Sequence, residues 1–82
     1  MNILVGKLNP QTTEKQLKKH FTSFGIISSV SIVKECYSGN SFGYGYVDMP
    51  NLNEAEKAIK KLNGTHLDGQ AIFVGKAWRN NH

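Results

Sequence analysis

The 82-residue sequence predicts an α+β fold in which two helices cover one face of a four-stranded antiparallel sheet. Four short segments carry the aliphatic or alternating pattern of β-strands. Two longer segments have apolar residues at helical spacing and begin at a capping residue. Their order along the chain is strand, helix, strand, strand, helix, strand. This βαββαβ order is that of the ferredoxin-like sandwich, for which we expect the strand order 4-1-3-2.

The first strand is predicted for residues 2–5, a short aliphatic run that ends at Gly6. The first helix is predicted for residues 14–24. Thr13 has the character of its N-cap, and Gln16 stands three residues later, which is the spacing of a capping box. Apolar residues of this helix repeat at helical spacing: Leu17, Phe21 and Phe24.

The second and third strands are predicted for residues 28–34 and 42–49, joined by a turn at 38–40. Pro50 ends the third strand, and Asn51 with Glu54 gives a second capping signal. The apolar face of the second helix consists of Ala55, Ala58, Ile59 and Leu62.

The fourth strand is predicted for residues 71–75. Since the periodic segments cover almost the whole chain without a linker or a repeat, we expect one domain over residues 1–82. Its core spans about 2–77, and a short tail spans 78–82.

Composition narrows the functional classes. No apolar run reaches the roughly 20 residues that a membrane-spanning helix needs, and the N-terminus lacks the layout of a secretory signal, so we expect a cytoplasmic protein without a membrane partner. Cys36 is the only cysteine, and with three scattered histidines a metal site is not expected. The net charge of +4 slightly favours a polyanionic partner.

The period-2 pattern of the strands separates two faces of the predicted sheet. Side chains predicted to point toward the helices are Ile3, Val5, Val30, Ile32, Val47, Met49, Ile72 and Val74. Side chains predicted on the other face are Leu4, Ser31, Val33, Phe42, Tyr44, Tyr46, Asp48 and Phe73. Four of these are aromatic, which is unusual for a solvent-facing sheet and indicates a contact surface.

Residues 42–49, with the sequence FGYGYVDM, resemble the longer signature of the RNA recognition motif family, K/R-G-F/Y-G/A-F-V-x-F/Y. Residues 3–8, ILVGKL, look like its shorter signature, and residues 55–64 are similar to its second helix. The resemblance implies non-catalytic binding of short single-stranded RNA across the sheet face, by stacking of bases on aromatic rings. The chain is also similar to compact single-domain members of the family found in bacteria. With a single binding platform, we expect weak, salt-sensitive and loosely specific binding.

The resemblance assigns Tyr46 to stacking on a base and Tyr44 to packing against a base or sugar. The sequence departs from the family pattern at three positions. Leu4 stands where a stacking aromatic is usual, Phe42 where a basic residue is usual, and Met49 where a terminal aromatic is usual. We expect Phe73, or Trp78 in the tail, to supply the missing ring.

Basic residues near the strand ends would contact the RNA backbone. The complete set of residues implied to bind RNA is Leu4, Lys7, Lys34, Phe42, Tyr44, Tyr46, Phe73, Lys76, Trp78 and Arg79. The remaining lysines are predicted on the helices behind the sheet, where ordinary solvation explains them. Gly43 and Gly45 are expected to point toward the helices, where a side chain would collide with the helix layer.

Two alternatives remain at this point. The apolar sheet face instead fits a protein-interaction module that docks a partner or self-associates weakly. A small enzyme on the same fold, of the acylphosphatase kind, is disfavoured because the single arginine, Arg79, lies in the tail rather than in a loop after the first strand. In addition, no histidine has a nucleophile or carboxylate at a suggestive spacing. We therefore expect no catalytic residue, no cofactor and no small-molecule substrate.

Overall fold

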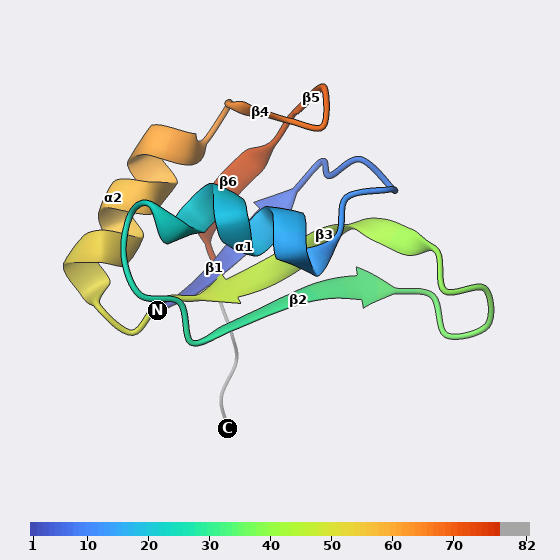
Figure 1. Cartoon of the computed structure of the whole chain (residues 1–82), viewed down its shortest axis with the longest axis horizontal. Helices are drawn as coiled ribbons and strands as arrows, with labels where there is room; N and C mark the ends of the chain where they lie inside the picture. Colours follow the sequence, from blue (N-terminus) through green and yellow to red (C-terminus); the bar gives the residue numbers. More distant parts are fainter. Residues whose placement is uncertain (78–82) are drawn as a thin grey trace.

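A computed structural model describes residues 1–77 of the chain. Figure 1 shows its elements in chain order. They are β1 (Asn2–Gly6), α1 (Glu14–Thr22), β2 (Ser29–Lys34), β3 (Ser41–Asp48), α2 (Leu52–Leu62), β4 (His66–Leu67), β5 (Gln70–Ala71) and β6 (Phe73–Lys76).

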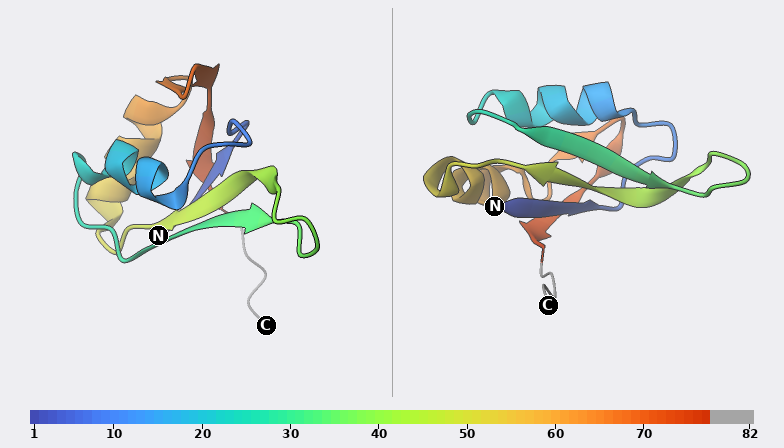
Figure 2. Two further views of the ribbon diagram at one scale, coloured as in Figure 1. Left: turned by 45° about the vertical axis from the view of Figure 1, so that its right-hand side comes forward. Right: turned by 90° about the horizontal axis from the view of Figure 1, so that it is seen from below.

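Four strands form one sheet in the order β2-β3-β1-β6, and all three pairings are antiparallel. This confirms the predicted architecture and strand order, with β6 as the fourth strand of the sandwich. The right-hand view of Figure 2 shows α1 lying over one side of the sheet. Within residues 1–77 no helix covers the opposite side, which we call the open face.

The core lies between the helices and the inward-pointing residues of the strands. Ile3, Val5, Val47 and Met49 have no solvent exposure, and Phe21 of α1 is equally buried. The remaining buried apolar residues are Leu8, Leu17, Ile32, Ala55, Ala58, Leu62, Ile72 and Val74. Val30 is half-buried against this cluster. The alternation read from the sequence therefore assigns the inward face correctly, because successive strand residues point to opposite sides.

Both helices begin at the predicted caps. The side chain of Thr13 accepts a hydrogen bond from the backbone N–H of Gln16, and the Gln16 side chain accepts one from the N–H of Thr13, at 3.2 and 2.8 Å. Asn51 Oδ1 accepts from the N–H of Glu54 at 3.0 Å. Each pair satisfies amide groups that a helix leaves unpaired at its start. Helix α1 ends at Thr22, two residues earlier than predicted.

A second hairpin precedes the last strand and is absent from the prediction. Strands β4 and β5 pair through a turn at Asp68 and Gly69, both of which have positive φ angles, of 51° and 76°. The Asp-Gly dipeptide is a strong hairpin signal that would have indicated this turn. Ile72 interrupts the predicted strand at 71–75, so β6 begins at Phe73. Among residues 1–77, neither helix has the length and apolarity to cross a membrane.

Candidate functional site

The open face is built on a row of residues that crosses all four strands. Leu4 of β1 lies opposite Tyr46 of β3 on one side and opposite Gly75 of β6 on the other. Ser31 of β2 completes the row opposite Tyr46. Residues that face each other across a ladder lie on the same side of the sheet, so these four positions share the open face.

Four aromatic residues lie on this face and are accessible to solvent. Phe42 is 58% exposed, Phe73 is 46% exposed and Tyr44 is 37% exposed, while Tyr46 is half-buried. The rings of Tyr44 and Tyr46 have centroids 6.2 Å apart and planes at 84°. This edge-to-face arrangement means that the two rings do not stack on each other. Exposed flat rings on a stiff sheet can take up other planar groups.

Phe73 lies over two positions that have no side chain. It pairs with Gly6, and a Cβ atom added at Gly6 would be 3.7 Å from the Phe73 Cβ. A Cβ atom added at Gly75 would be only 2.9 Å from the Phe73 Cζ. The ring thus extends along β6 over Gly75, which is the residue opposite Leu4. Phe73 and Leu4 therefore lie on the same face of neighbouring strands, in diagonal positions of the register.

The glycines of β3 serve another purpose than the one predicted. A Cβ atom at Gly45 would lie 2.3 Å from the Ser31 carbonyl oxygen and 3.0 Å from the Ile32 Cα, both in the backbone of β2. Gly45 therefore permits close approach of the neighbouring strand, where the β2–β3 register shifts. Gly43 has a φ of +84°, which L side chains rarely adopt. The expectation that the helix layer excludes their side chains is wrong.

The three described basic residues of the predicted set occupy different positions. Lys7 follows β1 directly, between Gly6, which pairs with Phe73, and Leu8, whose N–H donates to the Gly43 carbonyl at 2.8 Å. It therefore stands at the end of the open face near Phe42 and Phe73.

Lys34 and Lys76 begin on the other side of the sheet. Lys76 pairs with the fully buried Ile3, and Lys34 pairs with Ser41 beyond the irregularity in β2. Their side chains must bend around the strand ends to reach the open face. Trp78 and Arg79 lie outside the described residues.

The sequence interpretation gave no role to Tyr37, which is 95% exposed in the β2–β3 loop. This loop is ordered by Glu35, whose Oε1 accepts from the backbone N–H of Ser38 at 2.8 Å and also from the Ser38 hydroxyl. These two hydrogen bonds hold the pKa of Glu35 below its ordinary value. Tyr37 therefore lies exposed beyond the end of the sheet. In the sequence, its exposure is indicated by its position beside the turn predicted at 38–40.

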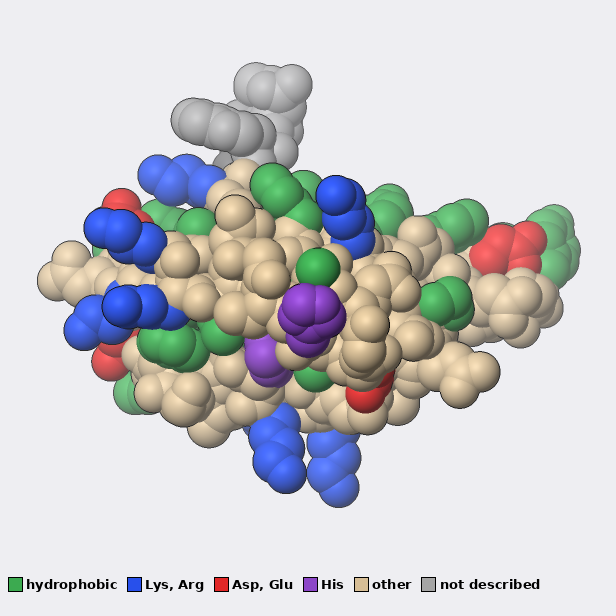
Figure 3. Space-filling model, turned by 90° about the horizontal axis from the view of Figure 1, so that it is seen from above, with side chains coloured by type: hydrophobic (Ala, Val, Ile, Leu, Met, Phe, Trp, Pro, Cys, Tyr) green, Lys and Arg blue, Asp and Glu red, His purple; other side chains and the backbone are tan. Residues whose placement is uncertain are grey.

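Positive charge is not concentrated on the open face. In Figure 3 the helix side lies at the bottom, and basic side chains project there, at the left and also at the top, where they stand beside apolar side chains. The helices carry six exposed lysines: Lys15, Lys18, Lys19, Lys57, Lys60 and Lys61. Among residues 1–77 none of these forms an ion pair, as expected for solvated charge.

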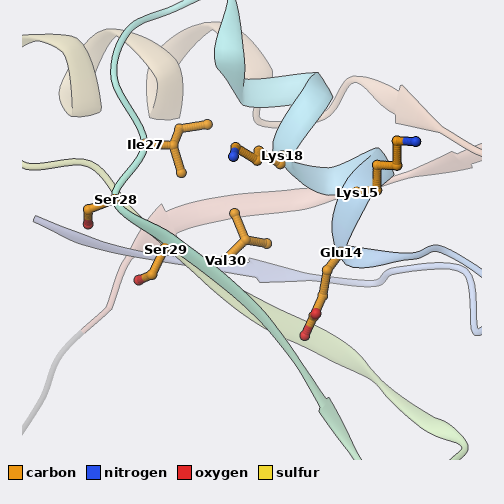
Figure 4. Close-up of a pocket in the computed structure, with 7 residues that line it drawn as sticks. All are labelled: Glu14, Lys15, Lys18, Ile27, Ser28, Ser29 and Val30. Carbon is orange, nitrogen blue, oxygen red and sulfur yellow. The ribbon is translucent and has the colours of Figure 1, made fainter.

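A groove of about 320 Å³ lies between α1 and the edge strand β2, away from the aromatic residues of the open face (Figure 4). Its walls include Ile27 and Val30, together with Lys15 and Lys18. Glu14 also faces it, and its Oε2 accepts from the backbone N–H of Ile32 at 3.0 Å. This contact covers part of the exposed edge of the sheet. Within the described chain, no three potential metal-binding side chains come together.

Residues 3–72 match the RNA recognition motif family. The RNA-binding protein PG1 superposes over 100% of this chain and 99% of its own, with 30% identity and a TM-score of 0.93. The two RNA recognition domains of Sex-lethal from Drosophila melanogaster give 31% identity, 95% coverage of this chain and a TM-score of 0.89.

A complex of the Sxl-lethal protein with RNA gives 29% identity over 98% of this chain and a TM-score of 0.92. The chain spans about half of each of the two Sex-lethal chains, 50% and 48%. These proteins resemble the present chain in fold and in sequence.

Proposed function

Because the chain belongs to the RNA recognition motif family, we propose that it binds short single-stranded RNA, without catalysis, across the open face of its sheet. The observation that carries this proposal is the group of four accessible aromatic residues on a face that no described helix covers. Apolar rings on a solvent-facing sheet cost free energy unless a ligand covers them. Unpaired nucleobases fit, since every base offers a flat π-face.

We assign the principal stacking role to Tyr46 and a contact with base or sugar to Tyr44. Leu4, opposite Tyr46, provides an apolar floor but no ring. Phe73 supplies the second ring, displaced from β1 toward β6 by the width of one strand. A stack of bases that begins over Tyr46 would therefore cross Leu4 and reach the Phe73 ring.

The backbone contacts come chiefly from Lys7, which follows β1 between Gly6, the partner of Phe73, and Leu8, the partner of Gly43. Lys34 and Lys76 contribute from the ends of their strands, and Phe42 adds an apolar contact in place of the usual charge. With few cations at the interface, electrostatic attraction is small and stacking dominates. We therefore propose weak binding with a loose overall sequence preference, and with a shallower salt dependence than the sequence alone suggests.

The test is a titration of fluorescently labelled RNA hexamers of random sequence at 50 and 200 mM salt, followed by anisotropy. Tyr46→Ala should weaken binding by about tenfold or more, because one stacked base contributes about 1–3 kcal/mol. Tyr37→Ala is the matched control, since it removes the same side chain outside the sheet. A wild-type protein that binds no RNA, or a Tyr46→Ala variant with unchanged affinity, would refute the proposal.

The competing function is self-association through the same apolar face, which exposed phenylalanines such as Phe42 would favour. The two functions predict different behaviour in solution. Sedimentation of the free protein across a hundredfold concentration range should show a monomer if the face is reserved for RNA. A concentration-dependent dimer that RNA does not dissociate would favour self-association.

A further inference from the structure

Beside Tyr46, the open face contains a shallow polar pocket of about 310 Å³. Its walls are Asn2, Ser29, Ser31 and the Tyr46 side chain. The strand register places Asp48 between two of these residues, since it pairs with Asn2 on β1 and with Ser29 on β2. Asp48 is two residues beyond Tyr46 on β3 and therefore points to the same side of the sheet. A base stacked on Tyr46 would have one edge over this pocket.

Asp48 adjoins the pocket through its strand partners Asn2 and Ser29, and its carboxylate is accessible to solvent. Its side chain is 43% exposed. Oδ2 accepts a hydrogen bond from the Ser28 hydroxyl at 2.6 Å, and Oδ1 lies 3.6 Å from the amino nitrogen of Met1. Each carboxylate oxygen has two lone pairs, so both oxygens retain capacity for another donor. These contacts fix the orientation of the carboxylate and leave both of its oxygens able to accept a further hydrogen bond.

The groups around the pocket differ in how strongly they discriminate between bases. The hydroxyls of Ser29 and Ser31 and the amide of Asn2 can each donate or accept, so they tolerate either kind of partner. An ionised carboxylate only accepts. It attracts base edges that carry N–H donors and repels edges that carry carbonyl oxygens. Asp48, next to the pocket on β3, is therefore the neighbouring group that would discriminate between base edges.

We propose that Asp48 selects the base that stacks on Tyr46, favouring guanine and disfavouring uracil. This inference rests on the proposed RNA binding. Guanine presents two adjacent donors, N1–H and the N2 amino group, which match the two oxygens of a carboxylate. Cytosine and adenine present one amino group each, next to an acceptor nitrogen. Uracil presents a single N–H between two carbonyl oxygens, both of which the carboxylate repels.

The experiment compares uridine hexamers that carry one central guanosine, adenosine, cytidine or uridine, titrated into the wild-type protein and into Asp48→Asn. The wild type should bind the guanosine hexamer about tenfold more tightly than the all-uridine hexamer, as a good two-donor contact provides. Asp48→Asn keeps the shape of the side chain but adds a donor, and should reduce this preference to about twofold or less. It should also bind the all-uridine hexamer slightly better than the wild type.

Glu56→Gln is the matched control, because it makes the same charge change at an exposed position of α2, on the helix side. It should keep the full guanosine preference. Two outcomes would overturn the inference while leaving the proposed RNA binding intact. One is equal affinity of the wild type for all four hexamers, and the other is a guanosine preference that Asp48→Asn retains. Absence of binding to any hexamer would overturn the proposed function together with the inference. Thermal unfolding of both variants checks that the sheet is intact.

Discussion

Phe73 occupies the space that Gly75 leaves above β6. A Cβ atom at Gly75 would be 2.9 Å from the Cζ and 3.0 Å from the Cε2 of the Phe73 ring. Gly75 lies opposite Leu4, the position where the family pattern has an aromatic residue. The ring therefore lies against the backbone at Gly75, and it remains 46% exposed to solvent. This relationship leads to the first prediction.

Phe73→Ala should weaken RNA binding by about tenfold, because it removes one of two stacking rings. Gly75→Val should also weaken binding, since its side chain would displace the Phe73 ring. If Gly75→Val weakens binding only by displacing the Phe73 ring, the double variant Phe73→Ala/Gly75→Val should bind no more weakly than Phe73→Ala alone. Anisotropy titrations of the three variants and of Leu52→Ala, an exposed apolar control on α2, measure this. Unchanged affinity of Phe73→Ala would show that the ring takes no part.

Gly45→Ala should destabilise the fold by about 1–3 kcal/mol, because the new methyl group would overlap the Ser31 carbonyl in β2. Gly6→Ala is the matched control in β1. Its Cβ would meet only the Phe73 side chain, at an ordinary distance of 3.7 Å, and it should change stability by about 0.5 kcal/mol or less. Urea unfolding followed by circular dichroism measures both free energies. Equal destabilisation by the two substitutions would contradict the role given to Gly45.

His20 should make stability depend on pH. Burial lowers its pKa from the ordinary 6.5, and its Nε2 lies 3.1 Å from the Thr65 hydroxyl, which itself donates to the Leu62 carbonyl at 2.6 Å. The unfolded chain then takes up a proton on this residue at a higher pH than the folded chain does. The stabilisation is complete above about pH 6.5 and is lost as the pH falls through the lowered folded-state pKa.

His20→Gln should reduce this dependence, whereas His66→Gln, at an exposed position, should leave it unchanged. Melting temperatures between pH 5 and 8 test the prediction. The prediction would be wrong if the wild-type protein became more stable as the pH falls from 7 to 5.5 and if His20→Gln abolished this increase.

Glu14→Ala should cost about 1–2 kcal/mol, because it removes the acceptor of the Ile32 N–H on the edge strand. Glu14→Gln retains a side-chain oxygen at the same position and should recover part of the loss. Denaturant unfolding compares the two. Hydrogen exchange at the Ile32 amide adds a local measurement, and an exchange rate that Glu14→Ala leaves unchanged relative to its neighbours would argue against this contact.

Local rules predicted much of this molecule. The caps at Thr13 and Asn51 follow from residue type and spacing, since capping involves only residues three positions apart. The division of strand residues between the core and the open face follows from the alternation of side chains in any strand. The hairpin at Asp68 and Gly69 is equally local, because the Asp-Gly dipeptide itself favours its turn.

Contacts between distant segments could not be predicted in this way. The reason that Gly45 must be glycine lies in the backbone of β2, which approaches most closely where the register shifts. The pairing of Asp48 with both Asn2 and Ser29 joins residues far apart in the chain, and it creates a pocket that no motif indicates.

The sequence by itself determined which side chains lie on the open face, because the direction of each side chain depends only on its own strand. The tertiary structure decided what surrounds each of them. The position of the Phe73 ring over Gly75 and the polar pocket beside Tyr46 depend on how three strands align. That alignment is the joint result of packing over the whole core, which local patterns do not contain.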